Sequence, residues 1–534
     1  MKKKLVAVIL ATTLMAFSGC VTININNEGE SEKEIAEEII ESSSENISQI
    51  QEEQASETSE QITDSETVSK YLDVDFNYFT DSCYEEISLM YGHYNTIKLN
   101  STEYPALTAA VNEYNENHAG EAQSYLDGLE EWVKEEYKEY GADMLLAPFV
   151  MECDMYLRRA DTQVLSVVES CYSYEGGAHG NSYYTSVNFD VQTGEEIALE
   201  SVITDMSSLP TILGTEIQEK YTDSTFWSED LASLFQEYVT PSNPDYIPTF
   251  TWTLDYQGVT FYFSDYELGS YANGRQEVTV TYSEYPELLN SQYFENAENN
   301  YVIALLNNWA GTDLDLNDDG VTDYVSVKKN YSVDTDFCES YDVTVNGNTF
   351  THDVYFYDLW TYYVKSGDDS YLYVQRRAES DFESVSVFKL TENSVEYVGD
   401  FTNSLESFTN SLDFKVAKRM DLLSTYFAKA NCTIGEDGLP VEKNNVYSVV
   451  GEVIITSTVP ITADLADEEG LLLGTSYEFP AGTDFQFIST DGTTYVDVQA
   501  SDGKICRFYT SEGWPPTVNE MNAESCFEML WYAG

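Results

Sequence analysis

Basic residues are scarce in this chain, and their scarcity argues against nucleic acid as a partner. The 534 residues include 25 Lys and Arg against 94 Asp and Glu, which gives a formal net charge of −69. Proteins that bind nucleic acid need clustered Lys and Arg to neutralise phosphates. A surface this acidic attracts basic partners instead, although a simple requirement for solubility explains the same charge.

The chain also lacks the sequence signatures of common enzymes. It has no G-x-S-x-G elbow, no H-E-x-x-H, no phosphate loop and no C-x-x-C pair. Its four histidines, His93, His118, His179 and His352, lie far apart. Strand alternation points His352 and the neighbouring Asp353 to opposite sheet faces. We therefore predict no catalytic residue, while the many carboxylates leave a glycosidase-like pair open.

Long apolar runs are missing after the N-terminus, so no later stretch is expected to span a membrane. Residues 1–20 have the pattern of a signal peptide, in which three lysines precede an apolar run at 5–17. The run ends in FSGC, which resembles a bacterial lipobox with Cys20 as the lipidated residue. We expect a lipid anchor that holds the protein on the outer face of the cytoplasmic membrane, facing the cell wall. An ordinary secretory peptide that ends near a cysteine is the alternative.

Residues 21–70 lack aromatic residues and proline and are rich in Glu, Ser, Gln and Asn. Such a segment buries too little apolar surface to offset its conformational entropy. We predict a disordered acidic tether.

Disulfide bonds are expected to be few. Seven cysteines remain besides Cys20, and this odd number does not fit a dense disulfide framework. We expect at most one or two pairs, with Cys506–Cys526 and Cys153–Cys171 as the candidates.

Residues 71–295 predict an α+β domain, an antiparallel sheet with helices on one side. Apolar residues at three- and four-residue spacings indicate one or two helices over 107–140, with a possible interruption at 115–120. Shorter helices are expected at 209–221, capped by Ser208, and at 228–238. Strands are expected at 148–157, 162–174, 183–191, 249–256, 259–263 and 277–282.

A glycine-rich corner joins two of these strands and contains Gly176, Gly177, His179 and Gly180. Glycines permit positive φ angles or a close approach of the backbone to another element. We treat these four residues as weak candidates for a binding site. His179 is a ligand, an acid or base, or a polar cap on the turn.

Two blocks around this corner carry a family resemblance. YEGGAHGNSYYTSVNFDVQTGEEIALESVI (174–203) and VTFYFSDYELGSYANGRQEVTVTYSEYPELL (259–289) resemble the extracytoplasmic domain pair of RsiV-type anti-sigma factors. The same pair occurs in the non-catalytic part of PdaC-type peptidoglycan deacetylases. The resemblance covers about residues 75–292 and implies a lysozyme-binding region. The deacetylase metal ligands and a cytoplasmic sigma-binding segment are not found in this sequence.

A calcium-type loop follows at 315–323, with the sequence DLNDDGVTD. Asp315, Asn317, Asp319 and Asp323 supply oxygen ligands at positions 1, 3, 5 and 9, and the carbonyl of Val321 supplies another. Ser326 occupies position 12, where an EF-hand has Glu, so the loop is more similar to those of FG-GAP-type repeats. We predict a calcium ion with a structural and not a catalytic role, and the alternative is an acidic hairpin turn without an ion.

The remaining chain predicts three segments. Residues 298–405 are expected to form a mainly β domain, residues 406–440 a helical connector, and residues 445–534 a small β-barrel. The last segment loosely resembles SH3-type wall-binding domains.

Together these features favour a lipid-anchored, non-enzymatic binding protein of the cell envelope. Peptidoglycan and a basic wall-active protein such as lysozyme are the candidate ligands. The alternative is a cell-wall hydrolase or deacetylase with an unfamiliar active site.

Overall fold

The computed structural model describes residues 71–141, 147–243, 248–295, 299–306, 311–332, 337–378, 383–511 and 516–532. The predicted signal peptide, Cys20 and the tether lie outside the described residues. Within the described ranges, none of the helices combines the length and the apolar composition needed to cross a membrane.

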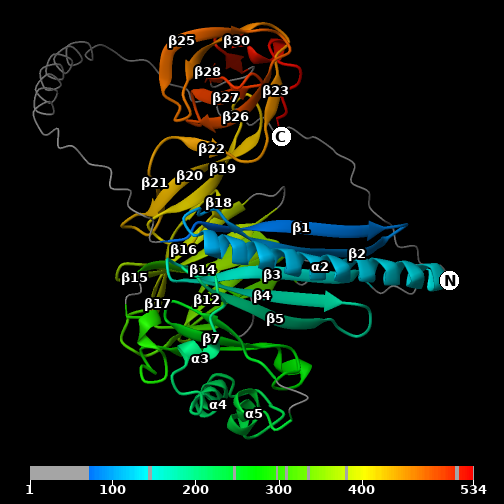
Figure 1. Cartoon of the computed structure of the whole chain (residues 1–534), viewed down its shortest axis with the longest axis vertical. Helices are drawn as coiled ribbons and strands as arrows, with labels where there is room; N and C mark the ends of the chain where they lie inside the picture. The colour runs from blue at the N-terminus through cyan, green and yellow to red at the C-terminus, as the bar shows by residue number, and fades with distance from the viewer. Residues whose placement is uncertain are drawn as a thin grey trace, which may run out of the picture. The chain divides into compact units, whose positions relative to one another are not determined.

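The first layer is a five-stranded sheet covered on one face by a long helix (Figure 1). Its strand order is β1-β2-β3-β4-β5. The pair β2 and β3 is parallel because the helix α2 connects them as a crossover, and the other pairs are antiparallel. The bounds are β1 Val74–Tyr84, β2 Ser88–Leu99, α2 Pro105–Tyr140, β3 Phe149–Ala160, β4 Val164–Tyr174 and β5 Asn181–Asp190.

Helix α2 runs without the interruption predicted at 115–120. Beyond His93 the pairing of β2 with β3 stops, which leaves one edge of β2 open. Asn115 satisfies that edge, because its side chain accepts a hydrogen bond from the Ile97 N–H (3.0 Å) and donates one to the Ile97 carbonyl (2.8 Å). The helix-weakening Asn therefore has a tertiary partner that favours the helix here.

A second, three-stranded sheet and short helices complete the α+β part. The single predicted sheet is thus two sheets, while the α+β class is confirmed. Asp230 caps α5 by accepting from the Ser233 N–H, whereas Ser208, the predicted cap of α4, makes no such bond. The bounds are α3 Leu199–Val202, α4 Leu209–Lys220, α5 Leu231–Val239, β6 Thr251–Leu254, β7 Gly258–Phe263, η2 Tyr271–Asn273, β8 Gln276–Thr281 and η3 Ser291–Tyr293.

The mainly β part that follows consists of two sheets packed on one apolar core. The chain passes from one sheet to the other between β13, which ends at Phe356, and β14, which begins at Asp358. One sheet contains β10 Thr312–Leu314, β11 Asp323–Tyr331, β12 Cys338–Val345 and β13 Asn348–Phe356. The other contains β9 Asn300–Leu305, β14 Asp358–Ser366, β15 Asp369–Arg377, β16 Glu383–Thr391 and β17 Ser394–Phe401.

The helical connector predicted at 406–440 is wrong, because this segment forms strands. Phe414 and Val416 in β19, and Tyr426, Ala428 and Ala430 in β20, are buried with a period of two. They share a core with β14–β16 and the C-terminal strands. The bounds are β18 Ser404–Glu406, β19 Phe414–Met420, β20 Tyr426–Ile434, β21 Pro440–Glu442, β22 Tyr447–Val449, β23 Ile454–Thr456, β24 Ile461–Ala466, β25 Leu472–Phe479, β26 Asp484–Thr490, β27 Tyr495–Ala500, β28 Ile505–Ser511, β29 Thr517–Val518, β30 Met521–Asn522 and η5 Ala523–Ser525.

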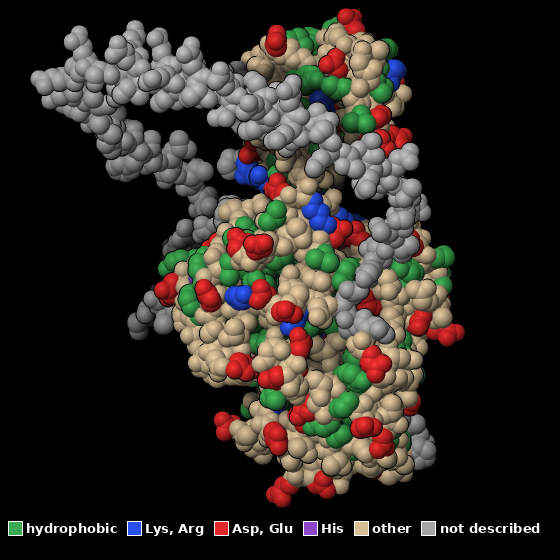
Figure 2. Space-filling view, turned by 90° about the vertical axis from the view of Figure 1, so that its left-hand side faces the viewer, with side chains coloured by type: hydrophobic (Ala, Val, Ile, Leu, Met, Phe, Trp, Pro, Cys, Tyr) green, Lys and Arg blue, Asp and Glu red, His purple; other side chains and the backbone are tan. Residues whose placement is uncertain are grey.

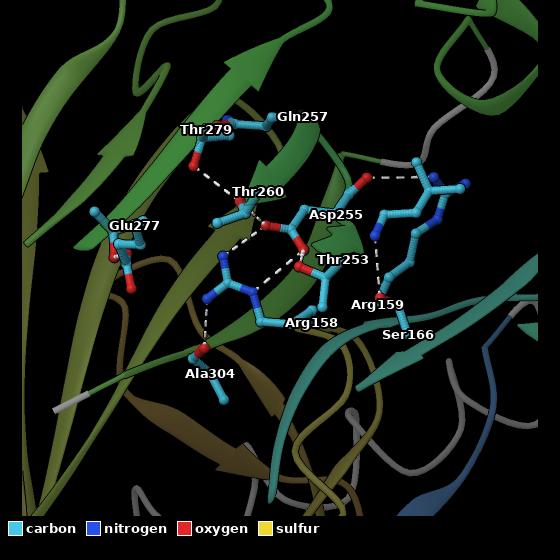
Figure 3. A network of polar contacts seen from close by, with 12 residues as sticks. Arg158, Arg159, Ser166, Thr253, Asp255, Gln257, Thr260, Glu277, Thr279 and Ala304 are labelled. Atoms are coloured by element: carbon cyan, nitrogen blue, oxygen red, sulfur yellow. Dashed lines mark hydrogen bonds and ion pairs between the residues drawn. The ribbon is translucent and has the colours of Figure 1, made fainter. Parts of the chain in front are cut away.

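A buried polar network joins three of the sheets (Figure 3). Arg158 of β3 forms a two-pronged ion pair with Asp255, which follows β6, at 2.6 and 3.2 Å. Its third nitrogen group donates to the carbonyl of Ala304 in β9 (2.9 Å). Thr253 and Thr260 donate their hydroxyls to the same Asp255 carboxylate at 2.8 and 2.6 Å. Each oxygen of the buried Asp255 carboxylate thus accepts one hydrogen bond from Arg158 and one from a threonine hydroxyl. A buried charge requires such partners.

Candidate functional site

An acidic groove runs between helix α2 and strands β4 and β5. It consists of two adjoining hollows of about 690 and 850 Å³, which share Asn117, Glu121 and Tyr125. The groove exists because α2 packs on the sheet through one apolar stripe, which holds the rest of its surface away from β5. That stripe is formed by Leu107, Val111, Ala122, Leu126, Leu129 and Val133.

Carboxylates and aromatic rings line the acidic groove, and no Lys or Arg is present among its described lining residues. On the face drawn in Figure 2, acidic side chains are more frequent than basic ones. The carboxylates are Glu113, Glu116, Glu121, Glu169, Glu175 and Glu196, and the aromatic residues include Tyr114, Tyr125, Trp132 and Tyr183. A low-dielectric groove with charges of one sign concentrates the field and attracts cationic groups.

His118 and Glu169 form a buried pair at the floor of the acidic groove. The Nε2 atom of His118 lies 3.1 Å from Oε1 of Glu169, and their side chains are 15% and 4% exposed. Neither atom has an aligned hydrogen-bond partner among the described residues. The other oxygen of Glu169 accepts from the Thr185 hydroxyl at 3.0 Å. Tyr114 stacks on the His118 ring, with centroids 5.8 Å apart.

The environment of this pair alters the pKa of two neighbouring groups. Burial by itself lowers the pKa of His118. The contacts with Glu169 and with the Asn95 carbonyl raise the pKa by a larger amount, so the net shift is upward. Burial and then the bond to Glu175 raise the pKa of Tyr125 to about 12. His118 is therefore stabilised as a cation beside Glu169, and Tyr125 stays a neutral donor.

A disulfide lies beneath the acidic groove. Cys153 of β3 and Cys171 of β4 face each other in register and are bonded, which confirms one of the two predicted pairs. The predicted Cys506–Cys526 pair is wrong, because both cysteines are free and buried. Among the described residues, Cys153, Glu169 and Cys171 are the one group of three candidate metal ligands within 4.8 Å of one another. The disulfide makes both sulfurs unavailable to a metal.

The glycine corner lies at one end of the acidic groove, next to Glu175. Gly176 and Gly177 have φ angles of +89° and +102°, and a side chain on Gly180 would collide with the Tyr172 ring. His179 does not reach into the groove. Its Nε2 contacts the Tyr266 hydroxyl (3.0 Å), its Nδ1 contacts the Gly180 carbonyl (2.8 Å), and its ring stacks on Tyr271.

These contacts bring together the two sequence blocks that carried the family resemblance. The Ser182 N–H donates to the Asp265 carboxylate (2.8 Å), and the Asp265 N–H donates to the Ser182 carbonyl (3.0 Å). His179 therefore has a structural role: its contacts connect the glycine corner before β5 to Tyr266 and Tyr271.

The calcium-type loop connects β10 to β11, as the hairpin interpretation expected. Its carboxylates are occupied by backbone amides: Asp315 accepts from Asp319 (3.1 Å) and Gly320 (2.9 Å), and Asp323 accepts from Leu316 (3.2 Å). Gly320 has a φ of +86°, which explains the glycine at this position. Calcium binding, with Asn317 and the Val321 carbonyl among the ligands, stays a prediction.

Two further histidines pair with carboxylates from other elements. His93 contacts Asp154 at 3.1 Å, and His352 lies 4.0 Å from Asp400. Burial lowers the pKa of His352, and Asp400 opposes that shift.

Sequence reasoning did not identify the His118–Glu169 pair. Glu169 lies on β4, 51 positions from His118 (169 minus 118), so no short motif records the contact. One local signal was present, because His118 continues the series of buried Leu107 and Val111 and partly buried Tyr114 at helical spacing. That series places His118 on the sheet-facing side of α2.

Comparisons with known proteins found a similarity within the α+β region. The family model described as a protein of unknown function, DUF3298, matches residues 201–283. A DUF3298 member from Bacteroides fragilis has 18% identity and a TM-score of 0.33, and the alignment covers 41% of this chain and 94% of that chain. A DUF3298 protein from Pseudomonas aeruginosa has 14% identity and a TM-score of 0.28, with 42% and 96% covered.

No curated protein matches this chain. The residues matched by the family model, 201–283, begin within α3 and end just after β8. This segment therefore resembles a DUF3298 domain.

Proposed function

We propose that this protein is a lipid-anchored, extracytoplasmic binding protein that captures a basic protein in the acidic groove. The observation that carries the proposal is the lining of that groove, in which carboxylates and tyrosines occur without a described Lys or Arg. Carboxylates steer and orient cationic side chains, and tyrosines add contact area with little loss of conformational entropy.

The likeness to RsiV-type and PdaC-type extracytoplasmic domains supports this proposal and suggests lysozyme as a representative ligand. Peptidoglycan is the other ligand that this likeness suggests. In the proposed arrangement, Cys20 carries the lipid and residues 21–70 act as a tether that allows the folded part to reach its ligand in the cell wall.

A capture experiment tests the proposal with the mature chain, residues 21–534. We expect the chain to bind immobilised lysozyme in low salt and to be released as ionic strength rises, because exposed charges are screened beyond about 10 Å at 0.1 M salt. Replacement of Glu113, Glu116 and Glu121 by Gln should weaken capture by about tenfold or more, since three carboxylates of the groove are lost.

A matched variant separates the groove from the overall charge. Glu131, Glu135 and Glu139 are exposed on the same helix but do not line the groove. Their triple replacement by Gln changes the net charge equally and should leave capture within about twofold of wild type. Equal losses in both triple variants would contradict the proposal. Capture by insoluble peptidoglycan, with no capture by lysozyme, would identify the wall as the ligand instead.

A cell-wall hydrolase is the second candidate function, and the His118–Glu169 pair favours it. A buried carboxylate beside a histidine, at the floor of a groove, has the composition of a general acid–base pair. The test is release of soluble fragments from purified wall by the wild type and by Glu169→Gln. Release that Glu169→Gln abolishes while the variant still captures lysozyme would support the enzyme, and no release by the wild type would exclude it for this wall.

A further inference from the structure

A second cleft lies on the opposite face of the first sheet. It has a volume of about 880 Å³ and is enclosed by β1–β4 on one side and by β11, β14, β15 and β18 on the other. Residues alternate between the two sheet faces, so Glu152 and Asp154 face this cleft while Cys153 faces the acidic groove. We call it the mixed-charge cleft.

Cations are concentrated in the mixed-charge cleft. Five of the 25 Lys and Arg residues of the chain line it, namely Lys98, Arg275, Lys329, Arg377 and Lys429. Six acidic residues line it as well, so acids and bases occur here in nearly equal number, whereas acids exceed bases 94 to 25 in the whole chain. The acidic groove, by contrast, has no described basic side chain other than His118.

Most of the acidic groups in this cleft already have partners. Asp358 pairs with Arg377, Glu406 pairs with Lys429, and Asp154 contacts His93. Asp75 accepts from both the N–H (2.7 Å) and the hydroxyl (2.8 Å) of Ser407. Glu383 accepts from Gln375 (3.2 Å). Burial raises the pKa of the remaining carboxyl, Glu152, and His93 opposes that shift.

Two lysines of the cleft are left without a carboxylate. Among the described residues, neither Lys98 of β2 nor Lys329 of β11 has a carboxylate oxygen within the 4.0 Å of an ion pair. Lys329 is half-buried, so solvent screens its charge less than at an open surface. Lys98, which is exposed, and Lys329 line opposite walls of one cleft, where unpaired ammonium groups are the chemistry that contacts an anion.

The neutral lining consists of aromatic rings and polar side chains. Tyr78 is 58% exposed as a whole residue, and Trp360 and Tyr172 are partly exposed in the same cleft. Asn77 and Gln375 line the same cleft, and the buried Gln375 amide already donates to Glu383 and accepts from the Leu405 N–H. An aromatic face next to amide groups matches a sugar ring, which presents C–H groups on its face and hydroxyls at its edge.

We infer that the mixed-charge cleft binds a carboxylate-bearing saccharide, with sugar rings on Tyr78 and Trp360 and carboxylates on Lys98 and Lys329. The lining favours a saccharide over an acidic peptide because its neutral contacts are partly exposed aromatic residues and amides, and not enclosed apolar pockets. Arg377 lies over the Trp360 ring, 5.4 Å from its centroid, and His93 packs against the Tyr78 ring at 4.9 Å, so a sugar ring would contact the remaining surface of each ring. The site is independent of the proposed capture of a basic protein, because it lies on the other face of the sheet.

Isothermal titration of the mature chain tests this inference with three probes of similar length. They are the tetrasaccharide of galacturonic acid, the neutral tetrasaccharide of galactose, and tetraglutamate. We expect the acidic saccharide to bind at least about tenfold more tightly than the other two, because only it offers both carboxylates and ring faces. Equal binding of the neutral sugar, tighter binding of tetraglutamate, or no binding of the acidic sugar at millimolar concentration would overturn the inference.

Variants on strand β11 locate the site. Lys329→Gln should weaken binding of the acidic tetrasaccharide by about fivefold, as should Lys98→Gln, because each removes one charge partner. Lys328→Gln is the matched control: Lys328 is exposed on the same strand and does not line the cleft. A loss in Lys328→Gln equal to that in Lys329→Gln would place the binding elsewhere and reject the cleft. Circular dichroism and the lysozyme capture assay report folding of each variant separately from this site.

Discussion

At the scale of single residues, the chemistry of the acidic groove centres on the proton of His118. The ring is held between the Asn95 carbonyl and Glu169, and these contacts outweigh the desolvation that disfavours the cation. A group whose pKa is higher in the folded state binds its proton more tightly there. Its contribution to stability is complete below the unfolded pKa of about 6.5 and is lost as pH rises through the folded pKa.

We therefore expect Glu169→Gln to destabilise the protein most at low pH. At pH 5.5 the variant should lose about 1 to 3 kcal/mol of unfolding free energy, because the carboxylate 3.1 Å from the His118 ring nitrogen is removed and the cation loses its charge partner. At pH 9 the difference should shrink, because the stabilisation is lost as pH rises through the folded pKa of His118. Urea unfolding at the two pH values measures both differences, and NMR titration should show a lower pKa of His118 in the variant.

Glu116→Gln is the control for this prediction, because Glu116 lines the same groove in an exposed position. Its effect should be within about 0.5 kcal/mol at either pH. A loss in Glu169→Gln that is independent of pH would show that Glu169 acts through packing or Thr185 and not through the charge of His118.

At the scale of secondary-structure elements, the loop of the β10–β11 hairpin has a sequence that suits both an ion-bound and an ion-free turn. The Asp315 and Asp323 side chains already close the loop through backbone amides. A calcium ion would replace these weak acceptor contacts with direct coordination by oxygen atoms. The same sequence pattern therefore serves an ion-bound and an ion-free turn.

If the loop binds calcium, added calcium should raise the unfolding temperature and EGTA should lower it. At calcium concentrations about a hundredfold above the dissociation constant, the added stability is about 2.7 kcal/mol. Asp319→Ala should abolish the calcium response, whereas Asp368→Ala, at an exposed hairpin turn elsewhere, should retain it. Scanning calorimetry with and without calcium measures the shift, and the same melting temperature in calcium and in EGTA would assign the loop to the ion-free alternative.

Elements with strong local patterns were predicted well, and those that depend on tertiary partners were not. The apolar stripe of α2 and the alternation of β3, β4 and β5 were visible in the sequence, and the structure contains all four elements. The segment around β19 and β20 failed because its apolar residues fit helical and strand spacing over short windows. Pairing of β19 with β18 and β20, and burial against β15 and β16, decide in favour of strands there.

At the scale of the whole molecule, the Arg158–Asp255 pair connects regions that are far apart in sequence. Both side chains are buried, and β3, β6 and β9 each contribute a group to the network. Breaking one side of a buried ion pair leaves the other charge without compensation, and this costs about 3 to 5 kcal/mol. The network therefore makes the mutual packing of the three sheets sensitive to a single substitution.

We expect Asp255→Asn and Arg158→Met each to lower the unfolding free energy by about 3 to 5 kcal/mol. The double variant should lose less than the sum, because neither charge then remains unpaired. Arg419→Met, which affects an exposed pair with Asp421, should cost about 0 to 1 kcal/mol. Guanidinium unfolding of the four variants measures these values. Additive losses in the double variant would show that the two side chains do not act as a unit.

The sequence by itself determined the α+β and mainly β classes, the long helix, the glycine corner and the β10–β11 hairpin. These features depend on apolar periodicity and turn chemistry, which act over a few residues. The tertiary structure alone decided the pairing of His118 with Glu169, the Arg158 network and the strand character of β19 and β20. Each of these needs a partner tens of residues away, and the free energy of such contacts comes from burial, which no short stretch of sequence records.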